Sequence, residues 1–208
     1  MVESEPGADT SEAFEAWLRC PRDQKRLTRH GAQLVCSDGH GYDIVDGIPV
    51  MLIQEREQTL WVAGASLAAA SRQPCAADEL AAYHLHTLGI SPEQVEQLKD
   101  LIAQGTAIDP VVTMLVAATN GILYKHLLGK LDSYPIPELR LPAGHGQRLL
   151  DVGCNWGRWS MAAARKGYDV VGVDPSLGAV LTAQRVARAL GLRARFVCAD
   201  ARYLPFAP

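Results

Sequence analysis

Three aspartates in the last third of the chain stand where acceptor groups could bind a nucleoside. Asp151, Asp174 and Asp200 each close or follow a short apolar run that is typical of a buried β-strand. A carboxylate after the second run can accept hydrogen bonds from both hydroxyl groups of a ribose, and one after the third run can accept from an adenine amino group. The pattern predicts a nucleoside-binding site at one edge of a sheet.

A glycine loop follows the first of these runs. Gly153 and Gly157 bracket it and let the backbone turn tightly and approach a ligand closely. Asp174 lies 21 residues after Gly153, at the distance expected for the next strand end of a nucleotide-binding unit. The candidate cofactor-binding residues are those of the loop and of the two later strand ends: Asp151, Gly153, Cys154, Asn155, Trp156, Gly157, Asp174, Pro175, Ser176, Asp200 and Ala201.

The elements that must position these residues alternate between strand and helix. Strands are predicted over 149–152, 170–173 and 195–198, and helices over 158–166 and 177–190. Right-handed crossovers place such strands in one open, doubly wound α/β sheet that binds its ligand at the carboxyl ends. The predicted fold class is therefore α/β, with the N-terminal half of a Rossmann-like sheet preceded by a small β-rich ribbon and a helical segment.

From Arg148 to Phe206 the chain resembles the class I S-adenosylmethionine-dependent methyltransferases. Asp-Val-Gly-Cys-Asn-Trp-Gly (151–157) is similar to the family's first motif, Val-Gly-Val-Asp-Pro-Ser (171–176) to its ribose motif and Cys-Ala-Asp-Ala (198–201) to its adenine motif. The resemblance implies S-adenosyl-L-methionine as cofactor and methyl transfer from its sulfonium as the reaction. A dinucleotide-binding oxidoreductase is the alternative within this fold, but it requires G-x-G-x-x-G, and Asn155 occupies the place of the second glycine.

The resemblance also implies that part of the family's sheet is missing. The family has seven strands, with its substrate-facing motif after the fourth, and the sequence ends at Pro208 before that strand. We expect a fragment whose first strand is an open edge and which is inactive alone. Because methyl transfer draws its reactivity from the cofactor, the sequence identifies no catalytic residue.

Four potential metal ligands lie near the N-terminus. Cys20 and Asp23 form one pair, and Cys36 and His40 form another twelve residues later. Short strands are expected around His30-Gly31, and a second hairpin, 42–45 and 48–51, around Asp46-Gly47. Ligand pairs on hairpins are how small zinc domains build a tetrahedral site.

This N-terminal segment resembles the zinc-binding activator domain of RNA and protein methyltransferases. The resemblance rests on Cys20-Pro, Cys36, His40 and the stretch Tyr-Asp-Ile-Val-Asp-Gly-Ile-Pro-Val-Met-Leu (42–52), and it implies Zn²⁺ as a possible second cofactor. Asp23 departs from the family's pattern, which has cysteine there. A metal-free ribbon held by its own small core therefore stays open as an alternative.

The expected domain organisation has five parts. A disordered tail (1–10) precedes the ribbon (11–53), a helical segment (54–132), a proline-containing linker (133–147) and the cofactor domain (148–208). Helices are predicted over 54–72, 76–88, from Ser91-Pro92 to Gly105, and over 111–128. Asn120-Gly121 inside the last of these indicates either tight helix packing or, together with Tyr124, a place beside the cofactor.

The composition and charge of the chain are those of a globular protein and not of a membrane or secreted protein. The 208 residues are 48% hydrophobic and 21% charged, as in ordinary globular proteins, with no N-terminal targeting signal and no apolar run long enough to span a bilayer. A cytoplasmic protein without a membrane partner is predicted. The net charge of −3 is uneven, because residues 140–208 hold 10 basic and 4 acidic residues. The methyl acceptor is left open among RNA, protein and small molecules, and a non-catalytic binding module or scaffold remains an alternative.

Overall fold

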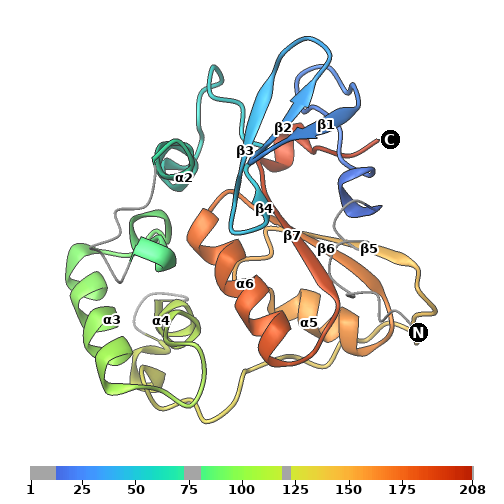
Figure 1. Cartoon of the computed structure of the whole chain (residues 1–208). Coiled ribbons are helices and arrows are strands. Elements are labelled where there is room, and N and C mark those ends of the chain that lie inside the picture. Colours follow the sequence, from blue (N-terminus) through green and yellow to red (C-terminus); the bar gives the residue numbers. More distant parts are fainter. Residues whose placement is uncertain (1–12, 73–80, 119–122, 208) are drawn as a thin grey trace, which may run out of the picture.

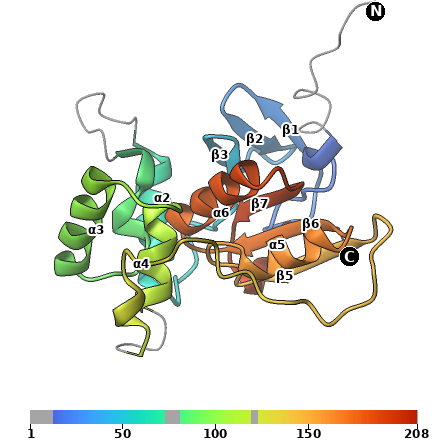
Figure 2. The ribbon, with the colours of Figure 1, turned by 90° about the horizontal axis from the view of Figure 1, so that it is seen from below.

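A computed structural model describes residues 13–72, 81–118 and 123–207 of the chain. A four-stranded antiparallel ribbon, a group of helices and a three-stranded parallel sheet pack together (Figure 1). Helix α6 lies between the sheet and helices α2, α3 and α4 (Figure 2). The predicted order of ribbon, helices and α/β unit along the chain is confirmed.

The parallel sheet is formed by the last third of the chain. Its strands β5 (Arg148–Val152), β6 (Asp169–Asp174) and β7 (Ala194–Cys198) lie in the order β5-β6-β7. Helices α5 (Arg158–Arg165) and α6 (Leu177–Ala189) make the crossovers. The α/β prediction is confirmed, because alternating apolar runs and amphipathic helices specify this unit locally.

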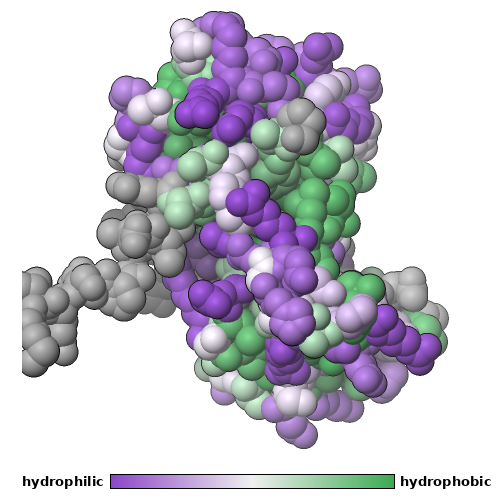
Figure 3. Space-filling view, turned by 90° about the vertical axis from the view of Figure 1, so that its right-hand side faces the viewer, coloured by the Kyte–Doolittle hydropathy of each residue, from purple (hydrophilic) through white to green (hydrophobic). Residues whose placement is uncertain are grey.

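Strand β5 is one of the two edge strands of the described parallel sheet, and β7 is the other. It pairs with β6 only, in the register Leu150↔Val171. Its side chains Leu150 and Val152 remain 42% and 49% exposed. Seen from the side on which β5 lies in Figure 1, the molecule shows apolar surface across its middle (Figure 3). The expected open edge is therefore present.

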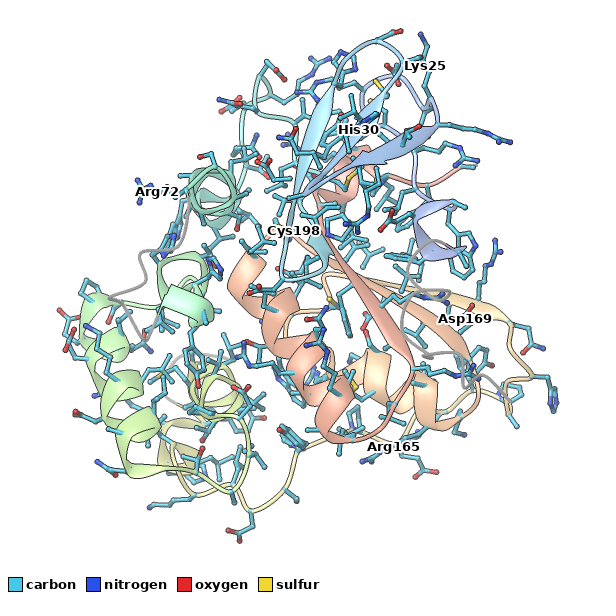
Figure 4. The ribbon with its side chains drawn as sticks, viewed as in Figure 1. Lys25, His30, Arg72, Arg165, Asp169 and Cys198 are labelled. Carbon is cyan, nitrogen blue, oxygen red and sulfur yellow. The ribbon has the colours of Figure 1, made fainter. Side chains whose placement is uncertain are left out.

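The ribbon contains four short strands joined in sequence. They are β1 (Leu27–His30), β2 (Gln33–Cys36), β3 (Gly41–Val45) and β4 (Ile48–Pro49). Asp46 and Gly47, with φ of 47° and 83°, form the tight turn between the last two strands, as the Asp-Gly pair predicts. Figure 4 shows His30 and Lys25 on this ribbon, away from the helices.

The two faces of the parallel sheet are covered by different parts of the chain. In β7, Phe196 and Cys198 belong to the hydrophobic core that contains the helices. Val197, between them, belongs with Ala199 to a second core, which includes Phe14, Leu18 and buried ribbon residues. Since side chains alternate along a strand, the helices cover one face and the ribbon covers the other.

The helical segment is less regular than predicted. It contains α2 (Trp61–Ala70), 3₁₀ turns η1 (Ala81–Tyr83) and η2 (Leu85–Thr87), α3 (Pro92–Gln104), α4 (Pro110–Ala118) and the 3₁₀ turn η3 (Lys125–Leu127). The capping box of α3 forms as expected between Ser91 and Gln94.

Two helix predictions in this segment are wrong. The helix expected over 76–88 is absent from its described part, because His84 has a left-handed backbone with φ of 46° that separates the two 3₁₀ turns. The helix expected to reach Leu128 ends as α4 at Ala118, and a 3₁₀ turn follows at 125–127. Asn120 and Gly121 lie outside the described residues. Tyr124 precedes the last turn and is 36% exposed.

No helix in the described ranges is long and apolar enough to cross a membrane.

Candidate cofactor and metal sites

A cavity of about 320 Å³ opens at the carboxyl ends of the parallel strands. All three strand ends contribute to its wall, through Val152 and Gly153, Val173 and Pro175, and the segment that starts at Ala199. Four of the residues predicted from the sequence line it: Gly153, Pro175, Asp200 and Ala201. The structure therefore brings parts of all three predicted motifs to one cavity of a size that suits a small ligand.

The glycine loop adopts a backbone that few residues other than glycine tolerate. Gly153 and Gly157 have φ of 76° and 82°, and Asn155 also has a positive φ of 50°. A Cβ on Gly157 would lie 3.1 Å from both Ala183 Cβ and Met161 Cε, whereas one on Gly153 would meet nothing within 4 Å. Gly157 is thus required for packing, and Gly153 leaves open space beside the cavity.

Asp174 ties the glycine loop to the loop after β6. Its Oδ2 accepts a hydrogen bond from the Asn155 backbone amide at 3.0 Å, and its Oδ1 accepts one from the Ser176 amide at 2.9 Å. Burial nevertheless raises the pKa of the Asp174 carboxyl above its ordinary value, with a smaller contribution from the negative charge of Asp151. Each carboxylate oxygen keeps a lone pair for a ligand hydroxyl.

The other two aspartates are engaged by the protein in different ways. Asp151 Oδ2 accepts a hydrogen bond from Ser160 Oγ at 2.7 Å, which anchors α5 to β5. Asp200 forms an ion pair with Arg202 at 2.7 Å, and that pairing lowers the pKa of Asp200. Arg202 thus takes up much of the acceptor capacity that the sequence assigned to an adenine amino group.

Several predicted residues place their side chains away from the cavity. Cys154 and Trp156 are each 4% exposed and belong to the helical core, and Trp156 lies against Tyr134 with ring centroids 6.4 Å apart. Ser176 caps α6, accepting from the Ala179 amide. The sequence distinguishes motif positions but not which side chains of a motif turn inward.

Part of the cavity wall was not anticipated from the sequence. The residues concerned, other than the strand ends, lie before or within α2 and after Asp200: Thr59, Leu60, Ala63 and Arg202. Arg202 also donates to the Glu57 carbonyl at 2.8 Å, which fixes the segment before α2 beside the adenine motif. Residues 57–63 carry no recognisable motif, so only the tertiary structure shows this contribution.

The four predicted metal ligands come together in the ribbon. One donor atom from each of Cys20, Asp23, Cys36 and His40 lies within 4.8 Å of every other. His40 Nδ1 is 3.5 Å from Cys20 Sγ, 3.3 Å from Cys36 Sγ and 3.1 Å from Asp23 Oδ2. Zinc bonds of about 2.3 Å to sulfur and about 2.0 Å to nitrogen separate these atoms by about 3.5 Å in a tetrahedron.

Groups around the cluster orient the ligands. The Tyr42 hydroxyl accepts from Arg22 Nη1 at 2.7 Å, so its own proton is available to Cys20 Sγ at 3.1 Å. The backbone amide of Lys25 donates to Asp23 Oδ1, and this bond is the main cause that lowers the Asp23 pKa to about 2. A carboxylate that is ionised at neutral pH is suited to metal binding.

A family comparison agrees with the sheet and its glycine loop. Residues 149–208 match the model of the family described as methyltransferase domain. This segment belongs to that family. The matched segment begins within β5 and includes all of the predicted cofactor-binding residues.

The match to a curated relative covers only part of that protein's length. The ubiquinone biosynthesis O-methyltransferase of Azorhizobium caulinodans is 48% identical over 48 residues, which is 23% of this chain and 19% of that protein. The chain therefore spans about a fifth of the curated relative it matches.

Two solved methyltransferase structures align with part of this chain at low TM-scores. The apo form of the S-adenosylmethionine-dependent methyltransferase SibL aligns with 58% of this chain and 40% of its own, at 21% identity and a TM-score of 0.29. Phosphoethanolamine N-methyltransferase 2 of Haemonchus contortus, solved with S-adenosyl-L-methionine, aligns with 58% of this chain and 27% of its own, at 26% identity and a TM-score of 0.31.

A larger cavity lies at the opposite end of the methyltransferase domain. It measures about 810 Å³ and is lined by residues at the starts of β6 and β7, among them Asp169 and Arg195, which form an ion pair. Figure 4 shows Asp169 far from Cys198, which closes β7 beside the predicted cofactor motifs. Parallel sheets of this kind bind ligands at the carboxyl ends of their strands, so the smaller cavity is the candidate cofactor site.

Proposed function

We propose that the chain carries the cofactor-binding part of an S-adenosylmethionine-dependent methyltransferase. The observation that supports this most directly is the convergence of Gly153, Asp174 and Asp200 at the carboxyl ends of three parallel strands. The family assignment of residues 149–208 supports the same function. The methyl acceptor belongs to an unidentified class, whether RNA, protein or small molecule.

The residues present fit S-adenosyl-L-methionine. The cavity of about 320 Å³ has an apolar side at Leu60, Val152 and Val173 that suits an adenine ring. Asp174, at the end of β6, keeps acceptor capacity for the two ribose hydroxyls because each of its oxygens accepts one backbone amide. Gly153 leaves its surroundings open, with no side chain to obstruct a ligand.

The bound cofactor would supply an electrophilic methyl group on a sulfonium, and the chain's own residues bind and orient it. Asp174 fixes the ribose. Asp200 is engaged in an ion pair with Arg202, so it contributes less to adenine binding than an unpaired carboxylate would. The glycine loop, held to the β6 loop through Asp174, fixes the position of the cofactor relative to the sheet. Orientation of this kind is the main contribution of a protein to an in-line displacement.

Calorimetric titration with S-adenosylhomocysteine tests the proposal. We expect the chain to bind it, Asp174→Asn to weaken binding roughly tenfold or more because a charge-assisted hydrogen bond is lost, and Asp200→Asn to weaken it less. Asp100→Asn, on the exposed side of α3, is the matched control and should bind as the parent does. Binding of NAD in preference to S-adenosylhomocysteine would favour the oxidoreductase alternative, and partner binding without any cofactor would favour the scaffold.

We further propose that Cys20, Asp23, Cys36 and His40 bind a structural zinc ion. The separations of their donor atoms match a tetrahedral site, and the Tyr42 hydroxyl lies where it can donate to a thiolate. Zinc would cross-link the start of the ribbon to the hairpin between β2 and β3. The hydrogen bonds now joining these side chains are also what a metal-free ribbon would use, so metal content decides between the two.

Elemental analysis after purification without added metal gives that decision. We expect one zinc per chain, lost in Cys36→Ser and retained in the control His30→Gln, whose side chain is exposed on β1. Asp23→Cys restores the usual ligand of the resembled family and should bind zinc more tightly. A folded, zinc-free parent protein that stays zinc-free when Zn²⁺ is added would refute the site.

A further inference from the structure

Helix α6 begins at Leu177, three residues after Asp174, and its first amides are capped by side chains from the helical segment. The Leu177 amide donates to Ser66 Oγ at 2.9 Å, and Ser66 Oγ lies 2.9 Å from the Pro175 carbonyl, to which it can donate. Ser66 belongs to α2 and is fully buried. The single Ser66 proton has a second, nearer acceptor in the Val62 carbonyl of α2 at 2.7 Å, so the bond from the Leu177 amide is the one that ties α6 to α2.

Thr87 caps the next amide of α6, that of Gly178. Its Oγ1 accepts from the Gly178 amide at 2.7 Å and donates to the His84 carbonyl at 2.9 Å, while its own carbonyl accepts from Ser176 Oγ. Thr87 is also fully buried. A Cβ on Gly178 would lie 2.8 Å from Thr87 Oγ1, so the glycine is what permits this approach.

These bonds fix the loop that carries the candidate ribose carboxylate. The free amides at a helix start require acceptors, and here two of them are supplied from more than 85 residues away along the chain. Asp174 Oδ1 is held by the Ser176 amide within the same loop. Asp174 itself does not line the cavity, but its neighbours Val173 and Pro175 do, so movement of this loop would shift the carboxylate relative to the cavity.

We propose that Ser66 and Thr87 are positioning residues for cofactor binding, acting through the loop 175–178 on the orientation of Asp174. This inference rests on the proposed function. It makes the helical segment, which has no methyltransferase motif, a determinant of cofactor affinity. Ser66 and Thr87 are both fully buried and neither lines the cavity, so we expect neither to contact the ligand directly.

Calorimetry with two ligands tests this role. Ser66→Ala and Thr87→Val should each weaken S-adenosylhomocysteine binding roughly three- to tenfold, as expected for one buried hydrogen bond. The affinity of these variants for the 2′-deoxyribose analogue of S-adenosylhomocysteine should change less. This analogue lacks one of the two hydroxyls that Asp174 would bind, so its binding depends less on Asp174. In the Asp174→Asn background, Ser66→Ala should have little further effect.

Controls separate positioning from general destabilisation. Ser71→Ala removes an exposed hydroxyl at the end of α2 and should change neither affinity nor melting temperature. Leu98→Ala, in the buried face of α3, should lower the melting temperature while leaving the preference for the ribose form unchanged. Hydrogen exchange at the Leu177 and Gly178 amides should quicken in the two positioning variants only.

The outcomes distinguish the two proposals. Failure of the parent chain to bind S-adenosylhomocysteine would overturn the proposed function together with the positioning role. Binding by the parent with unchanged affinity in Ser66→Ala and Thr87→Val would overturn the positioning role alone. The positioning role would also be overturned if Ser66→Ala and Thr87→Val lost equal affinity for both ligands, and if Leu98→Ala lost as much affinity at an equally lowered melting temperature. That pattern would show a general loss of stability.

Discussion

Met51 donates its backbone N–H to the carbonyl oxygen of Cys198 at 2.7 Å, which joins the ribbon to the edge strand of the parallel sheet. Val50 and Cys198 also form a parallel bridge. A second connection runs from the Arg19 amide to the Pro205 carbonyl at 2.9 Å. The ribbon is thereby bonded on both sides of the adenine motif.

Truncating Met51 should destabilise the ribbon and the sheet together. Its side chain is fully buried in the core shared by both parts, so Met51→Ala should lower the free energy of unfolding by about 2–5 kcal/mol. Urea unfolding followed by tryptophan fluorescence and by circular dichroism should give one coincident transition. Leu123→Ala, at a position 60% exposed, is the control and should change stability by less than about 0.5 kcal/mol. Two separate transitions would show that ribbon and sheet unfold independently.

Three glycines should respond differently to alanine. Gly157→Ala combines a left-handed backbone with contacts at 3.1 Å and should cost about 2–4 kcal/mol. Gly153→Ala has the backbone strain without the contacts and should cost about 1–2 kcal/mol. Gly64→Ala, inside α2 with open space around it, should stabilise by up to about 1 kcal/mol. Denaturant melts of the three variants give the order, and equal losses at 153 and 157 would contradict the packing argument.

Cofactor affinity should depend on pH through Asp174. Burial raises the pKa of its carboxyl above the ordinary value of 3.8, so the folded protein takes up this proton at a higher pH than a free aspartate. The protonated group is a weaker acceptor for ribose hydroxyls. Affinity for S-adenosylhomocysteine should therefore fall on acidification, and at a higher pH than the titration of a free aspartate would give. Titration calorimetry from pH 7 downward measures this decline, which should be absent in Asp174→Asn.

The raised pKa of Asp174 affects the stability of the fold in the opposite direction to cofactor affinity: acidification favours folding but weakens binding. Because the folded state holds the Asp174 proton more tightly than the unfolded chain, this group favours folding below its unfolded pKa. That contribution is lost as pH rises through the folded pKa. Ionised Asp174 is thus a cost to folding at neutral pH, offset in part by the two amides that donate to it.

Thiol labelling should separate the cysteines of the sheet from those of the ribbon. Cys154 and Cys198 are buried, and burial raises the pKa of both thiols, so neither should react with iodoacetamide at neutral pH until the protein unfolds. Labelling of Cys20 and Cys36 should increase when a chelator removes the proposed zinc ion. Peptide mass mapping identifies the labelled sites. Rapid labelling of Cys198 in the native state would contradict its place in the core.

Local features of the sequence were sufficient for many of the elements, although not for the helices expected over 76–88 and up to Leu128. The capping box at Ser91 and Gln94, the turn at Asp46-Gly47 and the strand–helix alternation after Arg148 depend on neighbours a few residues apart. Such signals act within one turn or one strand, so they can be identified without knowing the fold. They predicted the parallel sheet, its glycine loop and the ribbon hairpins.

What only the tertiary structure decided are contacts between distant segments. The capping of α6 by Ser66 and Thr87, the pairing of Met51 with Cys198 and the cavity wall at Leu60 join residues about 90 to 150 positions apart. A buried serine on α2 and a threonine in a 3₁₀ turn have no distinguishing sequence signal. Which amide each hydroxyl meets depends on how the helices pack against the sheet, because a hydrogen bond requires its two atoms to lie within about 3 Å of each other.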